Sequence, residues 1–172
     1  MPDSSGVRLA PWEPDDLPLL RRLVGDPAMM EHLGGPESEE KIIERQARYE
    51  RQGNGKGWAF KIIEAATGEP VGWVGVWETN WQGSDVWETG WSVVPEFQRR
   101  GFAAAGTALA MEHAREDGRR RFVHAFPSVD NAPSNAICRK LGFTLLGEHE
   151  FEYPKGNPMQ CNDWRLDLFE NS

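Results

Sequence analysis

The stretch Val93–Gly106, VVPEFQRRGFAAAG, joins an apolar, β-prone run to a helix rich in small residues. The start of a helix has unpaired backbone N–H groups and a partial positive charge, so it suits a phosphate. Gly101 and Ala103 leave the backbone open enough for pyrophosphate oxygens to reach those N–H groups. The chain has no Gly-Lys-Ser/Thr loop and no Gly-x-Gly-x-x-Gly after a first strand. These absences argue against a nucleoside-triphosphate loop and a dinucleotide fold.

The turn Gln98-x-x-Gly101-x-Ala103 resembles the acetyl-CoA-binding motif of the GNAT (Gcn5-related) N-acetyltransferases. The preceding segment, residues 87–91, WETGW, resembles the RimJ/RimL-like branch of that family, in which a glutamate of this strand is a common candidate base. About 30 residues after the Gln98 turn, residues 131–143, NAPSNAICRKLGF, resemble the later Asn-x-x-Ser motif of that family. They also fit an ordinary capped helix, and the cap and the cofactor contact would use the same end. The resemblance implies that acetyl-CoA contacts Val93, Val94, Gln98, Arg99, Arg100, Gly101, Phe102, Ala103, Ala104, Asn131 and Ser134.

Composition restricts the other classes of function. The 172 residues allow one domain with a substantial core, which we expect from about 7 to 169. A formal charge of −8 argues against nucleic acid as a partner. No apolar stretch approaches the roughly 20 residues that span a bilayer, and residues 1–10 lack a secretion signal. Two cysteines are too few for a disulfide framework or a zinc site, so we expect reduced thiols in a cytoplasm and no metal. We also expect a monomer or a homodimer.

Hydrophobic periodicity and turn residues predict a mixed α/β (α+β) domain. The expected strands cover 7–12, 58–64, 70–79, 86–94, 121–126, 143–153 and 162–169, and the expected helices cover 14–24, 37–52, 98–117 and 132–141. This order resembles the GNAT fold, which implies one mixed, mostly antiparallel sheet flanked by helices. The resemblance also implies that the parallel strands on either side of the cofactor helix splay apart to form a cleft.

The predicted reaction is aminolysis of a thioester, which needs a neutral amine close to the carbonyl. Glu88 is the leading candidate base. Alternation places it on the other face of its strand from Trp87, Trp91 and Val93, and an ionisable group in a segment rich in tryptophan is expected to have a raised pKa, nearer the working pH. An exposed strand glutamate is the alternative. His124 is more simply a packed core histidine than a base, and a core face is the simplest reading for most of the tryptophans.

Two further roles follow from the resemblance. A bulge in the strand before the turn would direct an N–H near Val93 toward the acetyl carbonyl. Many family members carry a tyrosine four residues after the motif serine, proposed to protonate the leaving thiolate, but here that position is Cys138. Cys138 is therefore a candidate acid, and simple packing is the favoured alternative.

The substrate mouth is expected at the loop 29–36 and at a turn over residues 80–85, so Met30, His32, Trp81 and Glu88 are the candidate acceptor contacts. Acidic Glu31, Asp85 and Glu88 favour a cationic amine. The predicted function is acetyl-CoA-dependent acetylation of a primary amine, on a small molecule or a protein N-terminus, by direct transfer in a ternary complex. A non-catalytic acyl-CoA-binding protein is the alternative.

Overall fold

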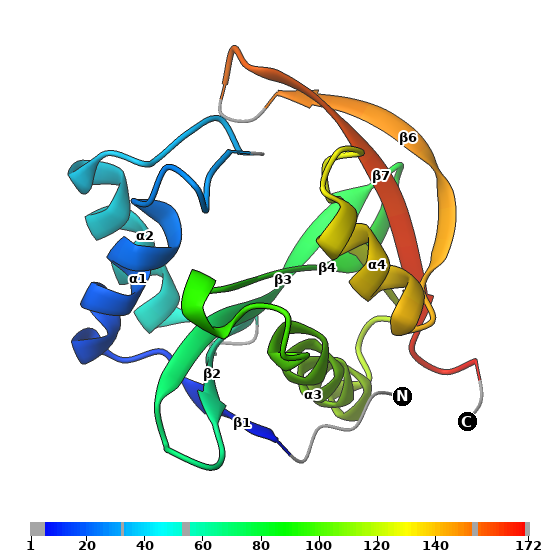
Figure 1. The fold of residues 1–172 in the computed structure, drawn as a ribbon. Coiled ribbons are helices and arrows are strands. Elements are labelled where there is room, and N and C mark those ends of the chain that lie inside the picture. The colour runs from blue at the N-terminus through cyan, green and yellow to red at the C-terminus, as the bar shows by residue number, and fades with distance from the viewer. Residues whose placement is uncertain (1–5, 32, 53–55, 153–154, 171–172) are drawn as a thin grey trace.

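A seven-stranded sheet organises the chain (Figure 1). The computed structural model describes residues 6–31, 33–52, 56–152 and 155–170. The strand order is β1-β2-β3-β4-β5-β7-β6, and every neighbouring pair is antiparallel except β4 and β5. The strands are β1 (Val7–Pro11), β2 (Gly57–Glu64), β3 (Pro70–Trp81), β4 (Ser84–Val93), β5 (Phe122–Ala125), β6 (Thr144–Glu152) and β7 (Pro158–Asp167). The predicted mixed, mostly antiparallel sheet is therefore confirmed.

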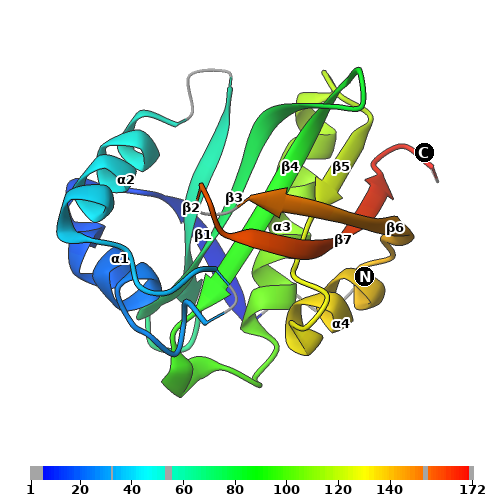
Figure 2. The same ribbon diagram turned by 90° about the horizontal axis from the view of Figure 1, so that it is seen from above.

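Helices cover both faces of this sheet (Figures 1 and 2). The α-helices are α1 (Leu17–Val24), α2 (Glu39–Arg51), α3 (Phe102–Asp117) and α4 (Ala132–Lys140). Helix α3 packs on one face against β1 to β4, whereas α1 and α2 lie over the other face. The α3 interface is close because the helix is rich in alanine and has a glycine, Gly106, at the contact. A Cβ added at Gly106 would come within 2.7 Å of the Ile62 side chain.

The hairpin between β3 and β4 is tighter than the sequence suggested. We expected a turn over residues 80–85, but the two strands pair as far as Trp81 and Ser84. Only Gln82 and Gly83 form the turn, with φ of 50° and 84°. Positive φ at both central residues is the geometry of a type I′ turn, whose twist matches that of the strands. Trp81 is therefore a strand residue.

Helix α3 also begins later than expected. Pro95–Phe97 form a 3₁₀ turn, and both Arg99 and Gly101 have a positive φ, of 65° and 82°. This backbone cannot continue as a helix, so α3 starts at Phe102 instead of Gln98. The last strand differs in the other direction: it begins at Pro158, four residues before the predicted start.

The middle of the sheet opens where β4 and β5 meet. These parallel strands form only two register pairs, Trp87 with Val123 and Glu88 with His124. Beyond Glu88, β4 has no described partner strand on its β5 side, which is the splay expected from the family resemblance. The β6–β7 hairpin extends from β5 across the other side of this opening (Figure 2). Among the described helices, none is long and apolar enough to cross a membrane.

Candidate active site

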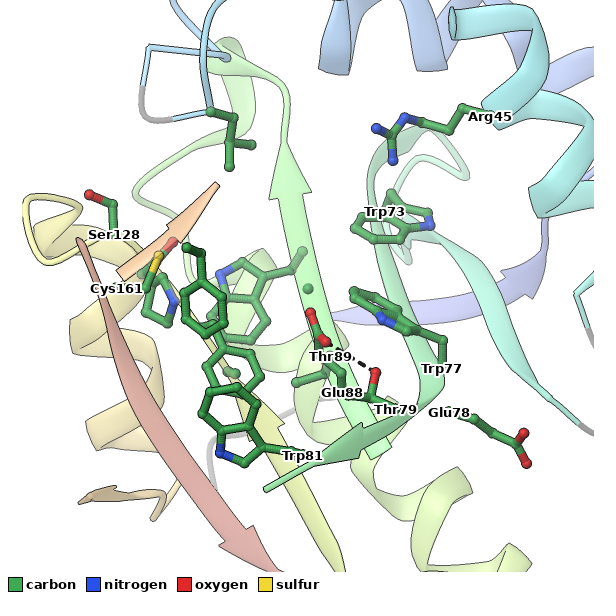
Figure 3. Close-up of a pocket in the computed structure, with 18 of the residues that line it drawn as sticks. Arg45, Trp73, Trp77, Glu78, Thr79, Trp81, Glu88, Thr89, Ser128 and Cys161 are labelled. Carbon is green, nitrogen blue, oxygen red and sulfur yellow. Dashed lines mark hydrogen bonds between the residues drawn. The ribbon is translucent and has the colours of Figure 1, made fainter. Parts of the chain in front are cut away.

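A cavity of about 1160 Å³ lies over the outer face of β3 and β4 (Figure 3). Helix α2 forms one side of it, and β5, the start of α4 and the β6–β7 hairpin form the other. The described lining includes Tyr49 on α2, Trp77 on β3, Glu88 on β4, Ser134 on α4 and Phe151 on β6. The cavity therefore lies between two walls, α2 on one side and β5, α4 and the β6–β7 hairpin on the other. It runs from the gap between β4 and β5 to the protein surface.

Glu88 lies on the floor of this cavity, in the middle of β4 (Figure 3). Thr79 Oγ1 donates a hydrogen bond of 3.1 Å to Glu88 Oε1. Burial raises the pKa of the Glu88 carboxyl, and side-chain hydrogen bonding by Thr79 and Trp77 opposes that increase. No described cation forms an ion pair with this carboxylate, so burial is the dominant influence on its pKa.

Two tryptophans that were expected to face the core line this cavity instead. Trp73 and Trp77 stand on β3 opposite Ser92 and Glu88, so they share the face of the carboxylate. Gly75 and Gly90 make room for their rings: a Cβ at Gly75 would approach Trp73 to 2.3 Å, and one at Gly90 would approach Trp77 to 3.2 Å. The ring of Trp73 also stacks on that of Tyr49 at 5.1 Å between centroids. By contrast, Trp87 is fully buried in the core.

The opposite wall is a cluster of aromatic rings around Trp81. Its ring lies 4.9 Å from that of Phe126 and 5.4 Å from that of Phe151. Trp81 Nε1 donates a hydrogen bond of 3.1 Å to Asp163 Oδ2, and the other oxygen of Asp163 lies 2.6 Å from His124 Nδ1. Asp163 is 2% exposed, so this buried carboxylate fixes the orientation of the indole. His124 is buried with it and is not among the described lining residues, which favours the packed reading.

Sequence reasoning did not identify this role of Asp163. It is the only acid in the strand segment CNDWRL, and alternation places it on the other face of the strand from Trp164 and Leu166. The donors that contact it, on Trp81 and His124, come from β3 and β5, which are distant from it in sequence. No local pattern in the sequence indicates that pairing.

The turn expected to bind the pyrophosphate has open donors. Gly101 is the N-cap of α3, and no described side chain caps this end of the helix. A Cβ at Gly101 would have no described atom within 4 Å, so space remains in front of the first N–H groups of α3. Arg99 is exposed beside this end. The start of α3 therefore keeps open backbone donors, and the resemblance predicts that they bind the pyrophosphate.

Two neighbours of that turn hold it in place. Gln98 Nε2 donates a hydrogen bond of 2.9 Å to the carbonyl of Val93. Arg100 pairs with Glu64 at 2.6 Å and lies 4.7 Å from the centre of the Phe102 ring. Arg100 is therefore already occupied by a carboxylate, which leaves Arg99 as the freer cation for a phosphate. Ala103 and Ala104 lie in the first turn of α3.

Backbone N–H groups of β4 point into the gap between β4 and β5. The bulge that was expected in this strand is absent from its described pairing with β3. Its described pairing with β3 runs from Val93 to Ser84 without a shift of register. The N–H of Val94 bonds to Val71 of β3, and antiparallel pairing alternates in direction. The N–H groups of Val93 and Trp91 therefore point away from β3, into the gap that β5 leaves. Regular alternation directs these groups there, so no bulge is needed.

The second motif is divided between the cavity and the core. The Asn131 side chain accepts a hydrogen bond of 3.2 Å from the N–H of Ser134, and both residues line the cavity. Cys138 lies one turn further along, is 0% exposed and belongs to the core. Burial raises the pKa of its thiol to about 12. The structure therefore argues against Cys138 as the acid and supports the packing alternative.

The expected acceptor contacts are only partly gathered at the cavity. Trp81 and Glu88 line it, whereas His32 lies outside the described residues. Met30 is 2% exposed and lines a smaller cavity beside α1, so it is a buried support of the loop here. Asp85 is exposed at the hairpin end, hydrogen-bonded to Asn80, and is not among the described lining residues.

Comparison with known proteins agrees with this geometry. The family model described as "Acetyltransferase (GNAT) domain" matches residues 7–144. Spermidine N(1)-acetyltransferase of Escherichia coli K12 is 28% identical over 153 residues, which are 88% of this chain and 81% of that protein. The crystal structure of spermidine N-acetyltransferase from Vibrio cholerae with CoA and spermine has a TM-score of 0.79 at 18% identity, covering 96% of this chain and 98% of that one. A Salmonella typhimurium acetyltransferase that modifies the N-terminal serine of ribosomal protein L7/L12 has a TM-score of 0.75 at 23% identity, covering 96% and 97%.

Proposed function

The chain belongs to the GNAT acetyltransferase family, whose acetyl donor is acetyl-CoA, and from this premise we propose that it acetylates a primary amine by direct transfer in a ternary complex. The amine belongs to a small molecule or to a protein N-terminus. The observation that carries this proposal is Glu88, a carboxylate with a raised pKa on the floor of a large cavity that also reaches Ser134 and Asn131. Those two residues belong to the motif that resembles a CoA-contacting segment.

The arrangement suits each requirement of thioester aminolysis. Acetyl-CoA would place its pyrophosphate at the start of α3 and its pantetheine arm in the gap between β4 and β5. The N–H groups of Trp91 and Val93 point into that gap and would stabilise the developing oxyanion. Glu88 would accept the proton of the attacking amine, directly or through a water, because a carboxyl with a raised pKa is a stronger base than an exposed one.

The departing thiolate has no described side-chain acid aimed at it in this scheme. CoA is a good leaving group, so water at the open cavity can supply the proton. Ser134 lines the cavity one helical turn before Cys138 and would lie near the sulfur. The reaction then depends mainly on holding amine and thioester together, which can contribute up to roughly 7–11 kcal/mol in favourable cases.

Release of free CoA thiol in the presence of a panel of primary amines tests the proposal. An acetyltransferase releases thiol only when acceptor and acetyl-CoA are both present, and mass spectrometry finds the acceptor heavier by one acetyl group. Acetyl-CoA binding without release across the whole panel would favour the alternative, a non-catalytic acyl-CoA-binding protein.

A further inference from the structure

Three basic side chains line the α2 side of the cavity and have no acidic partner among the residues that the structure describes. Arg48 and Arg51 belong to α2, and Lys56 immediately precedes β2. All three are exposed, and within the described residues none of them forms an ion pair. The guanidinium of Arg48 lies 5.9 Å from the centre of the Tyr49 ring, which itself lines the cavity. We call Arg48, Arg51 and Lys56 the basic wall.

The position of these residues is not explained by helix stability alone. Cations in the last turn of a helix interact favourably with its dipole, which accounts for Arg48 and Arg51 at the end of α2. The dipole does not require that they face the cavity, nor does it involve Lys56, which lies outside the helix. Arg45, one turn earlier on the same face, also lines the cavity, but it is bound to Glu37.

The acids of the cavity do not neutralise the basic wall. Glu78 is paired with Arg120 at 3.1 Å. Glu88 is on the floor, where Thr79 holds it. Glu152 belongs to the opposite wall, on β6, and accepts a hydrogen bond from the N–H of Gly156. In a chain of formal charge −8, one side of the cavity therefore has locally reversed charge.

We propose that the acceptor carries an anionic group, a carboxylate or a phosphate, in addition to its amine, and that the basic wall binds this anion while the amine faces Glu88. The inference rests on the proposed function and specifies its substrate class. A polycation would bring further positive charge against Arg48, Arg51 and Lys56 and would be disfavoured. The earlier expectation of a cationic amine depended partly on Asp85, which lies outside the described lining.

Matched amines provide the test. δ-Aminovalerate, pentylamine and cadaverine present the same primary amine on a five-carbon chain that ends in a carboxylate, a methyl group or a second amine. O-Phosphoethanolamine and ethanolamine form the corresponding phosphate pair. We expect kcat/KM for each anionic amine to exceed that of its uncharged counterpart by about tenfold or more, since one exposed ion pair is worth about two- to fivefold and several cations act together. The two pairs distinguish a carboxylate from a phosphate preference.

Variants of the basic wall separate charge from shape. Arg48→Gln with Arg51→Gln should lower kcat/KM for the preferred anionic amine by about tenfold and leave pentylamine unchanged. Arg48→Glu with Arg51→Glu should shift the preference toward cadaverine. Arg8→Gln, an exposed arginine on β1, is the matched control and should change neither. Circular dichroism verifies that each variant is folded.

Calorimetric binding of δ-aminovalerate and O-phosphoethanolamine in the presence of CoA separates this inference from the proposed function. Binding that Arg48→Gln with Arg51→Gln weakens, without turnover of any amine, would support the anion site and overturn the acetyl transfer. Turnover that favours cadaverine or pentylamine and is insensitive to these variants would overturn the anion site and leave the acetyl transfer intact. Absence of both binding and turnover would overturn both proposals.

Discussion

Glu88 illustrates how the surroundings of one residue turn an ordinary strand glutamate into a candidate base. Its neighbours on the cavity face are Trp77 across the ladder and Gly90 along the strand. Burial raises the pKa of the carboxyl, and the described groups that bond to it, Thr79 and Trp77, are neutral. A glutamate on the exposed end of the same hairpin would have none of these influences. The local environment of Glu88 therefore leads to a kinetic prediction.

Replacing Glu88 by Gln should lower kcat by about 10²–10⁴-fold, because the amide cannot accept the amine proton. Acetyl-CoA affinity should stay nearly unchanged. In the parent enzyme, kcat/KM should fall as the pH drops through the raised pKa of Glu88, because the protonated carboxyl is no longer a base. Steady-state kinetics across pH, with Asp85→Asn on the same strand as control, measures both effects. Equal activity of Glu88→Gln and parent at every pH would remove Glu88 from the mechanism.

For Cys138 we predict an effect on stability and little effect on catalysis, the reverse of Glu88. Its thiol is fully buried, with a pKa raised to about 12, so it is a weak acid without access to the cavity. Cys138→Ala should cost about 1 kcal/mol of unfolding free energy through the space it leaves in the core. The chemical step in single-turnover kinetics at saturating acetyl-CoA should change by less than tenfold. A larger loss in a fully folded variant, above about 1.4 kcal/mol of barrier, would restore the acid role.

At the scale of elements, the two ends of α3 allow a matched comparison. Gly101 at its start and Gly118 at its end both have a left-handed φ, of 82° and 75°. Asn tolerates this conformation better than Ala or Val, so it adds a side chain with little strain. Gly101→Asn should weaken acetyl-CoA binding by about tenfold or more, because its side chain would occupy the space in front of the helix start. Gly118→Asn should leave affinity unchanged, as titration calorimetry can show. Equal affinities would move the pyrophosphate away from this turn.

The packing of α3 on the sheet gives a second prediction at this scale. Alanine normally stabilises a helix by about 1 kcal/mol over glycine. At Gly106 the added Cβ would meet Ile62 Cδ1 at 2.7 Å and Cγ1 at 2.9 Å, and Ile62 is fully buried. Gly106→Ala should therefore destabilise the protein, since overpacking costs about 1–3 kcal/mol. Ile62→Val removes the nearest methyl, so it should cost less in the Gly106→Ala background than alone. Additive effects in urea unfolding would contradict the clash.

The order of elements was predictable from sequence because turns and periodicity are local signals. The stretch around Gly101 and the later Asn131 motif identified the family, and Gly101 and Asn131 are the N-cap residues of α3 and α4. The strand position of Trp81 was missed, because Gln82 in a left-handed conformation is not a local signal for a two-residue turn. The basic wall was missed for a different reason: Arg48 and Arg51 look like the solvated face of an amphipathic helix until the fold places a cavity beside them.

At the scale of the whole molecule, the sheet consists of two parts joined by a short seam. Strands β1 to β4 form one part and β5 to β7 the other, and only two register pairs connect β4 to β5. Glu88 belongs to one of those pairs, opposite His124. The same opening that creates the cavity therefore places a carboxylate in a partly buried position at the junction of the sheet. The folded state accepts an ionised group there at a cost in stability.

Because ionised Glu88 is partly buried, the free energy of unfolding should decrease as the pH rises through the range in which this carboxyl titrates. The pKa of Glu88 is raised in the folded chain above its ordinary value of 4.5, so the folded state holds the proton more tightly than the unfolded state. Below that ordinary value both states are protonated, and Glu88 imposes no penalty. As the pH rises toward the raised pKa, the unfolded chain ionises first, so the free energy of unfolding falls and then levels off above the folded pKa.

Glu88→Gln removes this titration and keeps the size of the side chain. The stability of the variant relative to the parent should therefore increase between pH 4.5 and the raised pKa, even though the variant loses activity over the same range. Urea unfolding of both proteins at several pH values, from acidic to mildly alkaline, measures the difference. Surface carboxylates with lowered pKa values, such as Asp117 beside Arg119, are present in both proteins and cancel in the comparison. A difference that stays constant with pH would mean that Glu88 has the same pKa folded and unfolded, and would weaken its case as the base.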